Sequence, residues 1–454
     1  MITKKDSFKI LSPTAILGYG FPLESFMNGI NEEPDLIAVD AGSVDPGPYY
    51  LGSGKSFTDR TGVKRDLRYI LKEGVKNGIP VVIGTCGGSG AKPHLTWCKE
   101  IVQEIAKEKG LSFKMGLIFA DVDKKDIISS IKDNKIEPLS HLPSLTEETV
   151  NESINIVAQM GVEPIINAIN KQCEVILAGR AYDPSVFAAL PIHLGFDPGL
   201  SLHLGKILEC AAIAAEPGSG TDSVFGILKT DSFILKPLNN ERRFTKESTA
   251  AHSLYEKSDP YSLPGPGGSL DLRNVDFTEL PDGQVKVEGS KFIRSSKYYV
   301  KLEGVKCVGY RTISIAGSHD PIMINNIDSI IRNVKDRVRD ILKSENIDGD
   351  IFFHIYGKNG VMGDIEPDKE ASTHEIGILI DVVSSSQEQA NTICSISRST
   401  LLHFGYPGRI STAGNLAFPF SPSDIKMGEV FEFSMYHLME IDNQDMFKLR
   451  IIDI

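Results

Sequence analysis

Chemically versatile side chains gather in four short segments of the first half of the sequence. One of them, residues 40–49, holds Asp40, Ser43 and Asp45 among glycines and prolines. Two carboxylates this close in sequence could hold a metal ion, share a proton or fix a substrate hydroxyl. The same residues would also form an ordinary rigid turn. We name Asp40 and Asp45 as candidate catalytic residues and Ser43 as a candidate substrate contact.

The second segment, residues 84–90, contains four glycines in seven residues. Glycine lets the backbone adopt positive φ values and bring several amide groups close to one anion. The spacing to the next lysine does not fit a Walker phosphate-binding loop. A tight strand-to-helix turn is the alternative, but we predict that the segment binds a carboxylate or a phosphate. The predicted binding residues are Gly84, Thr85, Gly87, Gly88, Ser89 and Gly90.

Cysteine and histidine give weaker signals. Cys86 lies in the glycine-rich turn at a predicted helix start, where amide groups lower the pKa of a thiol and can make it a nucleophile. Buried structural thiols are commoner, so Cys86 is a catalytic candidate with a structural alternative. The six cysteines show no CxxC spacing and the ten histidines no HExxH pair, so no zinc site is indicated. His94 and His203 are the histidines that we would test as bases.

Two aspartates after another strand-like run could bind a cation. Asp121 and Asp123 point to the same side of an extended segment, which suits a hard cation such as Mg²⁺. Asp123 is also placed to cap a helix that begins at Lys124, which is the commoner role. We name both as candidate metal ligands and a divalent cation such as Mg²⁺ as a candidate cofactor.

The fourth segment, residues 179–183, combines a cation with an aromatic side chain. Arg180 offers a planar fork that matches a substrate carboxylate. Tyr182 is a second candidate for substrate binding. Asp183 stands before a proline, as in a helix cap followed by proline at the first helical position. We expect Arg180 to contact the ligand and Asp183 to cap the helix.

The elements that must position these segments alternate along the first 190 residues. Short β-branched runs are followed by longer runs with helical spacing, and the apolar strands indicate a parallel sheet with helices on both faces. The carboxyl ends of parallel strands share one edge, so the four segments should converge there. The expected strands are residues 8–17, 36–40, 80–85, 113–121 and 173–179; the expected helices are residues 65–77, 95–109, 147–170 and 200–215.

The pattern of residue types changes after residue 222, where strand-like alternation (224–235) and a Pro/Gly-rich stretch (259–268) follow. A chain of 454 residues is also longer than a single hydrophobic core usually organises. We therefore predict an α/β domain over residues 1–235, which carries the site, and an α+β, sandwich-like domain over residues 236–454. Its expected strands are residues 298–302, 307–315, 350–355, 375–383 and 429–437; its expected helices are 324–343 and 386–402. Polar loops at 357–364 and 409–415 could close over the site or contact another subunit.

Charge and hydropathy exclude some partners. A formal net charge of −12 gives no support to nucleic-acid binding, which needs a concentrated basic face. The apolar runs are far shorter than the roughly 20 residues that cross a bilayer, and no signal-peptide core is visible. We expect a cytoplasmic protein with no nucleic-acid or membrane partner.

Long stretches of the sequence resemble the acyclic terpene utilisation (AtuA-type) family. They are DAGSVDPGPYYLG (residues 40–52), GTCGGSG (84–90), AGRAYDP (178–184) and TAGNLAFPFSPSD (412–424). The resemblance spans most of the chain. It implies a bacterial-type catabolic protein, in a family named after a pathway that degrades branched terpene acids as coenzyme A thioesters. It supplies no catalytic residues, so the candidates above rest on their own chemistry.

These observations favour an enzyme that acts on a small organic acid or an acyl-CoA thioester, with lyase, hydratase or isomerase chemistry. Amide groups and an arginine would bind a carboxylate while an acid or base moves a proton. The alternative is a non-catalytic metabolite-binding or partner subunit of a catabolic complex. We expect a homo-oligomer or a small partner subunit in either case. A dehydrogenase is less favoured because no GxGxxG opens the first helix.

Overall fold

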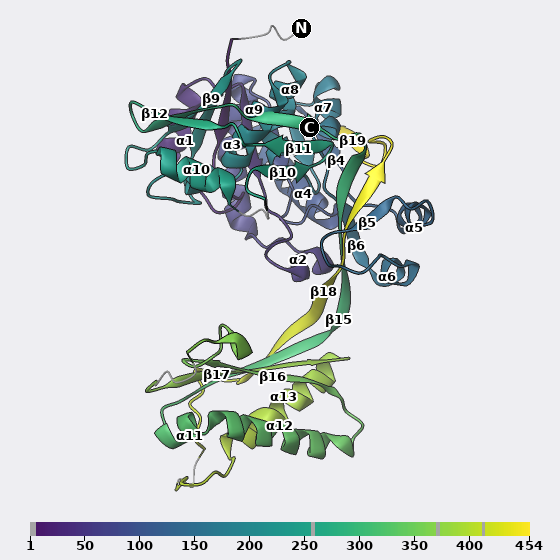
Figure 1. The fold of residues 1–454 in the computed structure, drawn as a ribbon, viewed down its shortest axis with the longest axis vertical. Helices are drawn as coiled ribbons and strands as arrows, with labels where there is room; N and C mark the ends of the chain where they lie inside the picture. The colour runs from purple at the N-terminus through teal and green to yellow at the C-terminus, as the bar shows by residue number, and fades with distance from the viewer. Residues whose placement is uncertain (1–5, 256–258, 369–372, 411–413) are drawn as a thin grey trace. The chain divides into compact units, whose positions relative to one another are not determined.

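The computed structural model describes residues 6–255, 259–368, 373–410 and 414–454 (Figure 1). The chain divides into two compact units: unit 1 comprises Met1–Lys306 and Phe433–Ile454, and unit 2 comprises Cys307–Glu432. The boundary expected after residue 235 falls inside a strand, β9 (Ser232–Pro237), because the strands that follow extend the same sheet of unit 1.

Within the described residues, unit 1 is built on a ten-stranded sheet in the order β12-β13-β9-β8-β1-β2-β3-β7-β4-β19. The strands from β1 to β4 in this order are parallel, and the strands on either side extend the sheet in antiparallel fashion. The parallel strands are β1 (Phe8–Ser12), β2 (Leu36–Asp40), β3 (Val81–Gly84), β7 (Val175–Ala178) and β4 (Lys114–Ile118). The others are β8 (Val224–Leu228), β9, β13 (Gln284–Glu288), β12 (Asp276–Leu280) and β19 (Leu449–Asp453).

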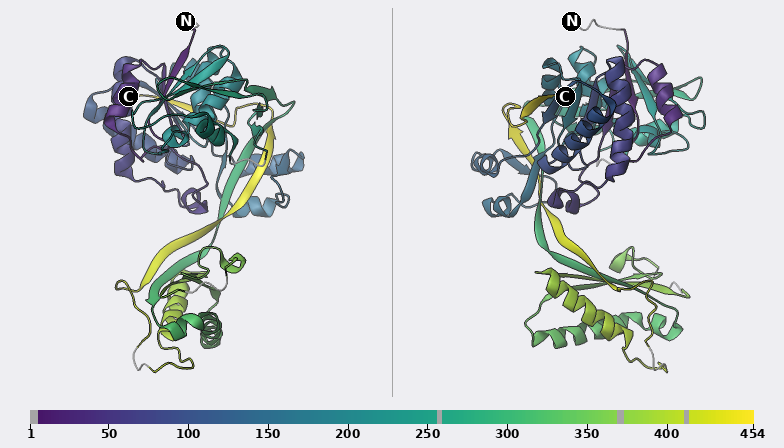
Figure 2. Two further views of the ribbon diagram at one scale, coloured as in Figure 1. Left: turned by 60° about the vertical axis from the view of Figure 1, so that its left-hand side comes forward. Right: turned by 180° about the vertical axis from the view of Figure 1, so that it is seen from behind.

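Helices cover both faces of this sheet, as the apolar strands predict (Figures 1 and 2). On one face, α1 (Leu23–Asn31), α3 (Arg60–Asn77) and α4 (Lys92–Lys109) share a core with alternate residues of the strands. On the other face, α7 (Glu163–Asn170), α8 (Asp183–His193) and α9 (Pro198–Leu208) pack. Gly84 at the end of β3 lies against α8 on this second face, because a Cβ atom at that position would be 2.2 Å from Val186 of α8. The predicted α/β class is confirmed.

The helix expected over residues 147–170 is wrong. The segment forms α6 (Glu147–Glu152), β6 (Ile154–Ala158) and then α7. Ile156 and Val157 are buried in an extended strand that pairs with Leu302–Val305 of β15 (Tyr298–Ser318), while Ile154 is exposed. Tertiary pairing has overridden a helical spacing of apolar residues here. The two strands expected at 298–302 and 307–315 are likewise one long strand, β15.

The remaining elements of unit 1 surround the carboxyl edge of the parallel strands or extend from it. A three-stranded sheet of β10 (Ser262–Gly265), β11 (Gly268–Asp271) and β14 (Lys291–Arg294) contains the Pro/Gly-rich stretch. The helix expected over residues 200–215 ends with α9 at Leu208, and a 3-10 turn, η1 (Ala211–Ala214), follows. Shorter elements are α2 (Pro48–Ser53), α5 (Lys124–Lys132), β5 (Ile136–Pro138) and α10 (Lys246–Leu254).

Unit 2 is an antiparallel sheet with helices on one face (Figure 1). Its core joins buried residues of α12 and α13 to alternate residues of β16 and β17. The elements are α11 (Pro321–Asn325), α12 (Ile327–Lys343), β16 (Gly349–Tyr356), η2 (Gly363–Ile365), β17 (Ile376–Ser384) and α13 (Gln387–Leu402), together with parts of β15 and of β18 (Asp424–Ile441). The predicted loop at 409–415 lies partly outside the described residues. Across the described chain, every helix is too short or too polar to span a membrane.

Candidate functional site

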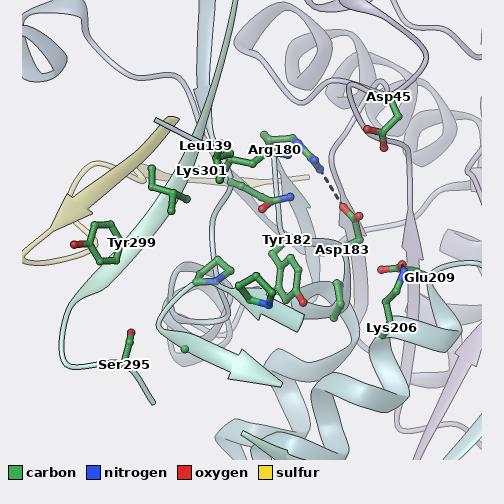
Figure 3. Close-up of a pocket in the computed structure, with 17 residues that line it drawn as sticks. Asp45, Leu139, Arg180, Tyr182, Asp183, Lys206, Glu209, Ser295, Tyr299 and Lys301 are labelled. Carbon is green, nitrogen blue, oxygen red and sulfur yellow. Dashed lines mark hydrogen bonds and ion pairs between the residues drawn. The ribbon is translucent and has the colours of Figure 1, made fainter. Parts of the chain in front are cut away.

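Unit 1 contains a pocket of about 360 Å³ beyond the carboxyl ends of its parallel strands (Figure 3). Its walls come from the loops after β2 and β7, the end of α9, the β10–β11 hairpin and the beginning of β15. The volume lies at the small end of the range for ligand pockets, about 300–1,000 Å³. Charged side chains form much of the lining: Asp45, Arg180, Asp183, Lys206, Glu209 and Lys301.

Arg180 is fixed by its hydrogen-bond acceptors although it lines the pocket. Its Nε donates to Glu303 Oε2 at 2.7 Å, and its Nη1 donates to Asp183 Oδ1 at 3.0 Å. Nη1 also donates to the carbonyl oxygen of Ala181 at 2.8 Å. Burial alone would lower the pKa of Arg180, but the two carboxylates outweigh it and raise the pKa well above its usual value. Arg180 is therefore a permanent, immobile positive charge at the pocket wall.

Glu303 holds Arg180 from behind and was missed by sequence reasoning. It is completely buried on β15, where it also accepts from Lys301 Nζ at 2.8 Å. Burial would raise the pKa of Glu303, but the attraction of Arg180 and Lys301 outweighs it and lowers the pKa. In the sequence, Glu303 alternates with apolar residues of the strand and would be expected on a solvated face.

Asp183 is the first residue of α8 and lies between Arg180 and the end of α9 in Figure 3. The residue before the helix is Tyr182, so the predicted cap is displaced by one position. The carboxylate of Asp183 instead accepts the hydrogen bond from Arg180. Burial raises the pKa of Asp183, while Arg180 acts against this rise. With 26% of its side chain exposed, Asp183 remains accessible to a ligand in the pocket.

A buried ion pair at the end of α9 completes the charged part of the pocket. Lys206 Nζ lies 2.8 Å from Glu209 Oε1, and both side chains are less than a tenth exposed. Lys206 Nζ also lies 4.8 Å from the centre of the Tyr255 ring. Such a pair loses the hydration of both charges, so its retention at a pocket wall suggests a role in ligand binding. The apolar spacing of α9 gave no sign of this role.

Asp40 lies at the end of β2, behind the pocket. It is 6% exposed; Oδ2 accepts from the amide of Gly42 at 3.2 Å, and Oδ1 has no hydrogen-bond partner among the described residues. Burial raises the pKa of Asp40 well above its usual value, and the charge of Asp183 raises it further. A carboxyl group whose pKa is raised by burial and by a neighbouring carboxylate is typical of sites that transfer protons.

We predict that Asp40→Asn stabilises unit 1 increasingly as the pH rises above about 4. A group whose pKa is raised on folding contributes stability below its unfolded pKa and loses it as the pH rises through the folded pKa. Asparagine has no such loss. Fluorescence of Trp97, the single tryptophan, would report denaturant unfolding of unit 1 between pH 4 and pH 9.

The control for this experiment is Asp59→Asn, because the pKa of Asp59 is lowered by hydrogen bonds from the amides of Gly62 and Thr61 at the start of α3. Its contribution has the opposite sign and is lost only as the pH falls below about 4, so the stability difference between Asp59→Asn and the unmodified protein should stay nearly constant between pH 4 and pH 9. A constant difference in stability between Asp40→Asn and the unmodified protein over the whole pH range would contradict the raised pKa of Asp40.

The glycine-rich turn at residues 84–90 is buried in unit 1 and contributes no lining residue to the pocket among the described residues. A Cβ atom at Gly90 (φ +69°) would lie 2.2 Å from the amide nitrogen of Arg180, and one at Gly88 (φ +94°) would lie 2.4 Å from Phe57. These glycines are needed for close packing. Thr85 accepts from the amide of Ala181 at 3.3 Å, so the turn positions the Arg180 segment. Anion binding by the six predicted residues stays an untested prediction; they are Gly84, Thr85, Gly87, Gly88, Ser89 and Gly90.

Cys86 is completely buried beneath this turn. Burial raises the pKa of its thiol well above the usual value, and the neighbouring Cys98 adds to the rise. The amide effect expected at a helix start is therefore outweighed, and the geometry favours the structural alternative. The thiol lies 3.7 Å from the carbonyl oxygen of Ile83.

Asp45 and Ser43 form the exposed rim of the loop after β2. The Ser43 hydroxyl donates to Asp45 Oδ2, and the Asp45 amide donates back to Ser43 Oγ at 3.2 Å. Asp45 lines the pocket, but Ser43 does not. The loop thus combines a local turn with one carboxylate that faces the ligand space.

Cation binding by Asp121 and Asp123 stays an untested prediction. Asp121 Oδ1 accepts from the amide of Lys92 at 2.9 Å and thereby caps α4, while burial raises its pKa. Asp123 precedes α5, but its side chain makes no cap hydrogen bond there. Within the described ranges, no group of three or more histidine, cysteine or acidic side chains is arranged to hold a metal ion.

The two histidines singled out from the sequence lie away from the pocket. His94 Nε2 lies between the carbonyl oxygens of Tyr50 and Lys55, and burial lowers its pKa. His203 is enclosed between two serine hydroxyls, and burial lowers its pKa to about 3. Both geometries are those of hydrogen-bonded core residues.

The predicted convergence is thus partial. The pocket brings together Asp45, Arg180 and Tyr182, with Asp40 and Thr85 behind them. It also uses side chains that the sequence did not single out for binding, which are Asp183, Lys206, Glu209 and Lys301. Three of these residues, Asp183, Lys206 and Lys301, lie within helices or strands. The spacing of apolar residues accounts for those elements and gives no sign of a binding site.

Comparison with protein families identifies a match over most of the chain. The model described as "Acyclic terpene utilisation family protein AtuA" matches residues 58–419, which is most of the chain. No curated protein and no solved structure matches the chain significantly.

Proposed function

Since the chain belongs to the acyclic terpene utilisation family AtuA, we propose that it is a catabolic enzyme that binds a small organic acid, or the acyl part of its coenzyme A thioester, in the pocket of unit 1. The reaction is of the lyase, hydratase or isomerase type. The observation that carries this proposal is the convergence of Arg180, Asp183, Lys206 and Glu209 on one pocket that is large enough for a small ligand.

Positive charge in the pocket supports binding of a carboxylate or a polarised carbonyl group. Arg180 and Lys206 bring two cations to the pocket wall, and the surrounding protein excludes most of the water that would screen them. The chain's own acidic partners hold both cations in place before the ligand arrives. Such preorganisation lowers the entropy that a ligand loses on binding.

Asp183 is the general base in this proposal. Burial raises its pKa, which makes the carboxylate a stronger base, and Arg180 fixes its orientation. Removal of a proton next to a carboxylate or thioester carbonyl would leave negative charge near Arg180 and Lys206. Asp40, whose pKa burial raises well above its usual value, lies behind this pair.

The test is a substrate panel of hydroxy acids, unsaturated acids and their coenzyme A thioesters, each with and without Mg²⁺. Turnover would be followed by chromatography and binding by the shift in melting temperature. We expect turnover of at least one class and a loss of its thermal shift in Arg180→Ala. The absence of both turnover and thermal shift across the whole panel would refute the proposal.

The second candidate function is a metabolite-binding or partner subunit without activity of its own. It is favoured by the internal partners of Arg180 and by the burial of Cys86, since neither group resembles an activated catalytic side chain. This candidate predicts a thermal shift without turnover. It also predicts that a second copy or a small partner chain is needed for any reaction.

A further inference from the structure

One wall of the pocket is the turn between β10 and β11. Pro264, Gly265, Pro266 and Gly268 all line the pocket. Gly265 pairs with Gly268 across the turn, and Gly267 between them has a φ of +76°. A proline followed by a glycine with positive φ is a rigid turn sequence. The Pro/Gly-rich stretch thus serves the site.

This wall is anchored to the body of unit 1. Leu263 and Leu270, which flank the turn, are buried in a small core with Leu202 of α9 and Tyr182. β11 also pairs with β14 in the three-stranded sheet. Because these leucines are buried in one core with Ala188 of α8 and Leu202 of α9, the turn is held close to both helices.

Gly265 is in close contact with the ring of Tyr182. A Cβ atom at position 265 would lie 2.8 Å from Cε1 and 2.9 Å from Cζ of that ring. Distances this short require the ring to move, and Tyr182 itself lines the pocket. The backbone of Gly265 does not have a positive φ, so alanine is conformationally permitted there.

We propose that Gly265, through the position of Tyr182, sets the size limit for the apolar part of the ligand; this inference rests on the proposed function. Apolar lining comes from Leu139, Tyr182, Pro184, Pro264, Pro266 and Leu438. In Figure 3, Leu139 and Lys301 lie on one side of the pocket, and Lys206 and Glu209 lie on the other. The ligand class is a small organic acid whose polar group meets the charged side chains and whose compact apolar substituent meets the turn.

Because the turn is rigid, it cannot move to accommodate a ligand with one more methylene group. In an apolar pocket, one methylene group changes the discrimination between two ligands by about 10–200-fold. Removing the ring of Pro264 should enlarge the same space. The two substitutions Gly265→Ala and Pro264→Ala are therefore expected to shift the size preference in opposite directions.

The experiment measures dissociation constants by titration calorimetry for a series of carboxylic acids that grow by one carbon, starting from the smallest acid that binds the unmodified protein. For Gly265→Ala we expect at least a 10-fold loss of affinity for the largest acids and less than a 2-fold change for the smallest. For Pro264→Ala we expect the series to extend by one carbon. The control is Gly405→Ala in unit 2, where a Cβ atom would meet nothing within 4 Å.

The outcomes separate this inference from the proposed function. If the unmodified protein binds the acids and both variants keep its order of size preference, the size limit lies elsewhere and the inference is wrong. If no acid binds the unmodified protein, both the proposed function and this inference fail. Should Gly265→Ala not fold by circular dichroism, Pro264→Ala alone decides, because its truncation adds no atom to the wall.

Discussion

Replacing Glu303 with alanine is expected to lower the free energy of unfolding of unit 1 by about 3–5 kcal/mol. The substitution leaves the buried Arg180 without its closest carboxylate, which lies 2.7 Å from Nε. Asp183 remains as a partner of Arg180, but only through Nη1. Denaturant unfolding followed by the fluorescence of Trp97 would measure the change, because Trp97 lies on α4 of unit 1.

The matched control is Glu152→Ala. Glu152 is also paired with a lysine of β15, Lys306 at 3.6 Å, but its side chain is 52% exposed. Exposed pairs contribute about 0–1 kcal/mol, so the control should lose little stability. Equal losses of unfolding free energy in the two variants would show that the buried ion pair between Glu303 and Arg180 contributes no more stability than an exposed pair. Glu303→Gln, which keeps the shape, should fall between the unmodified protein and Glu303→Ala.

The largest expected effect on activity is that of Asp183→Asn. General bases typically contribute about 10²–10⁴-fold to turnover, and asparagine cannot accept a proton at this position. The amide keeps an oxygen that accepts the Arg180 hydrogen bond, so ligand binding should change by less than about 10-fold. Steady-state kinetics with the best substrate of the panel would then show kcat falling far more than KM rises.

The pH profile adds a second measurement to this prediction. In the unmodified enzyme, kcat/KM should rise with pH through the pKa of Asp183, which burial raises, because only the ionised form acts as a base. The control is Asp197→Asn, since Asp197 caps α9 and asparagine caps equally well. Asp183→Asn with unchanged kcat would assign the base to another residue.

Local sequence patterns predicted the parallel part of the fold because its strands are buried on both faces. All residues of β2, β3 and β7 are buried, and each expected strand overlaps the observed one. Periodicity failed where a segment forms non-local pairs. Residues 154–158 have helical spacing of apolar positions, yet their pairing with β15, about 150 residues away, makes them a strand.

The site was predicted where it follows parallel strands and was missed where it depends on packing. Asp45, Arg180 and Tyr182 come after strand ends and do line the pocket. The glycines at 84–90 were expected to face an anion, but close packing against Phe57 and the Arg180 backbone also requires glycine. Composition alone does not separate these two uses.

Lys206 and Glu303 could not have been identified from the sequence. Each is a charged residue within a regular helix or strand, where a solvated face is the usual explanation. Their partners come from the tertiary structure: β15 brings Glu303 to Arg180, and the end of α9 faces the loop after β7. A buried charge becomes visible only when the neighbouring elements are in place.

A crystal structure of the protein with the tightest-binding acid of the panel would test the central claim most directly. We expect electron density for its carboxylate in the pocket of unit 1, within hydrogen-bonding distance of Arg180 or Lys206 and beside Asp183. Density at another place, or an empty pocket at saturating ligand concentration, would contradict the assignment of this pocket as the functional site.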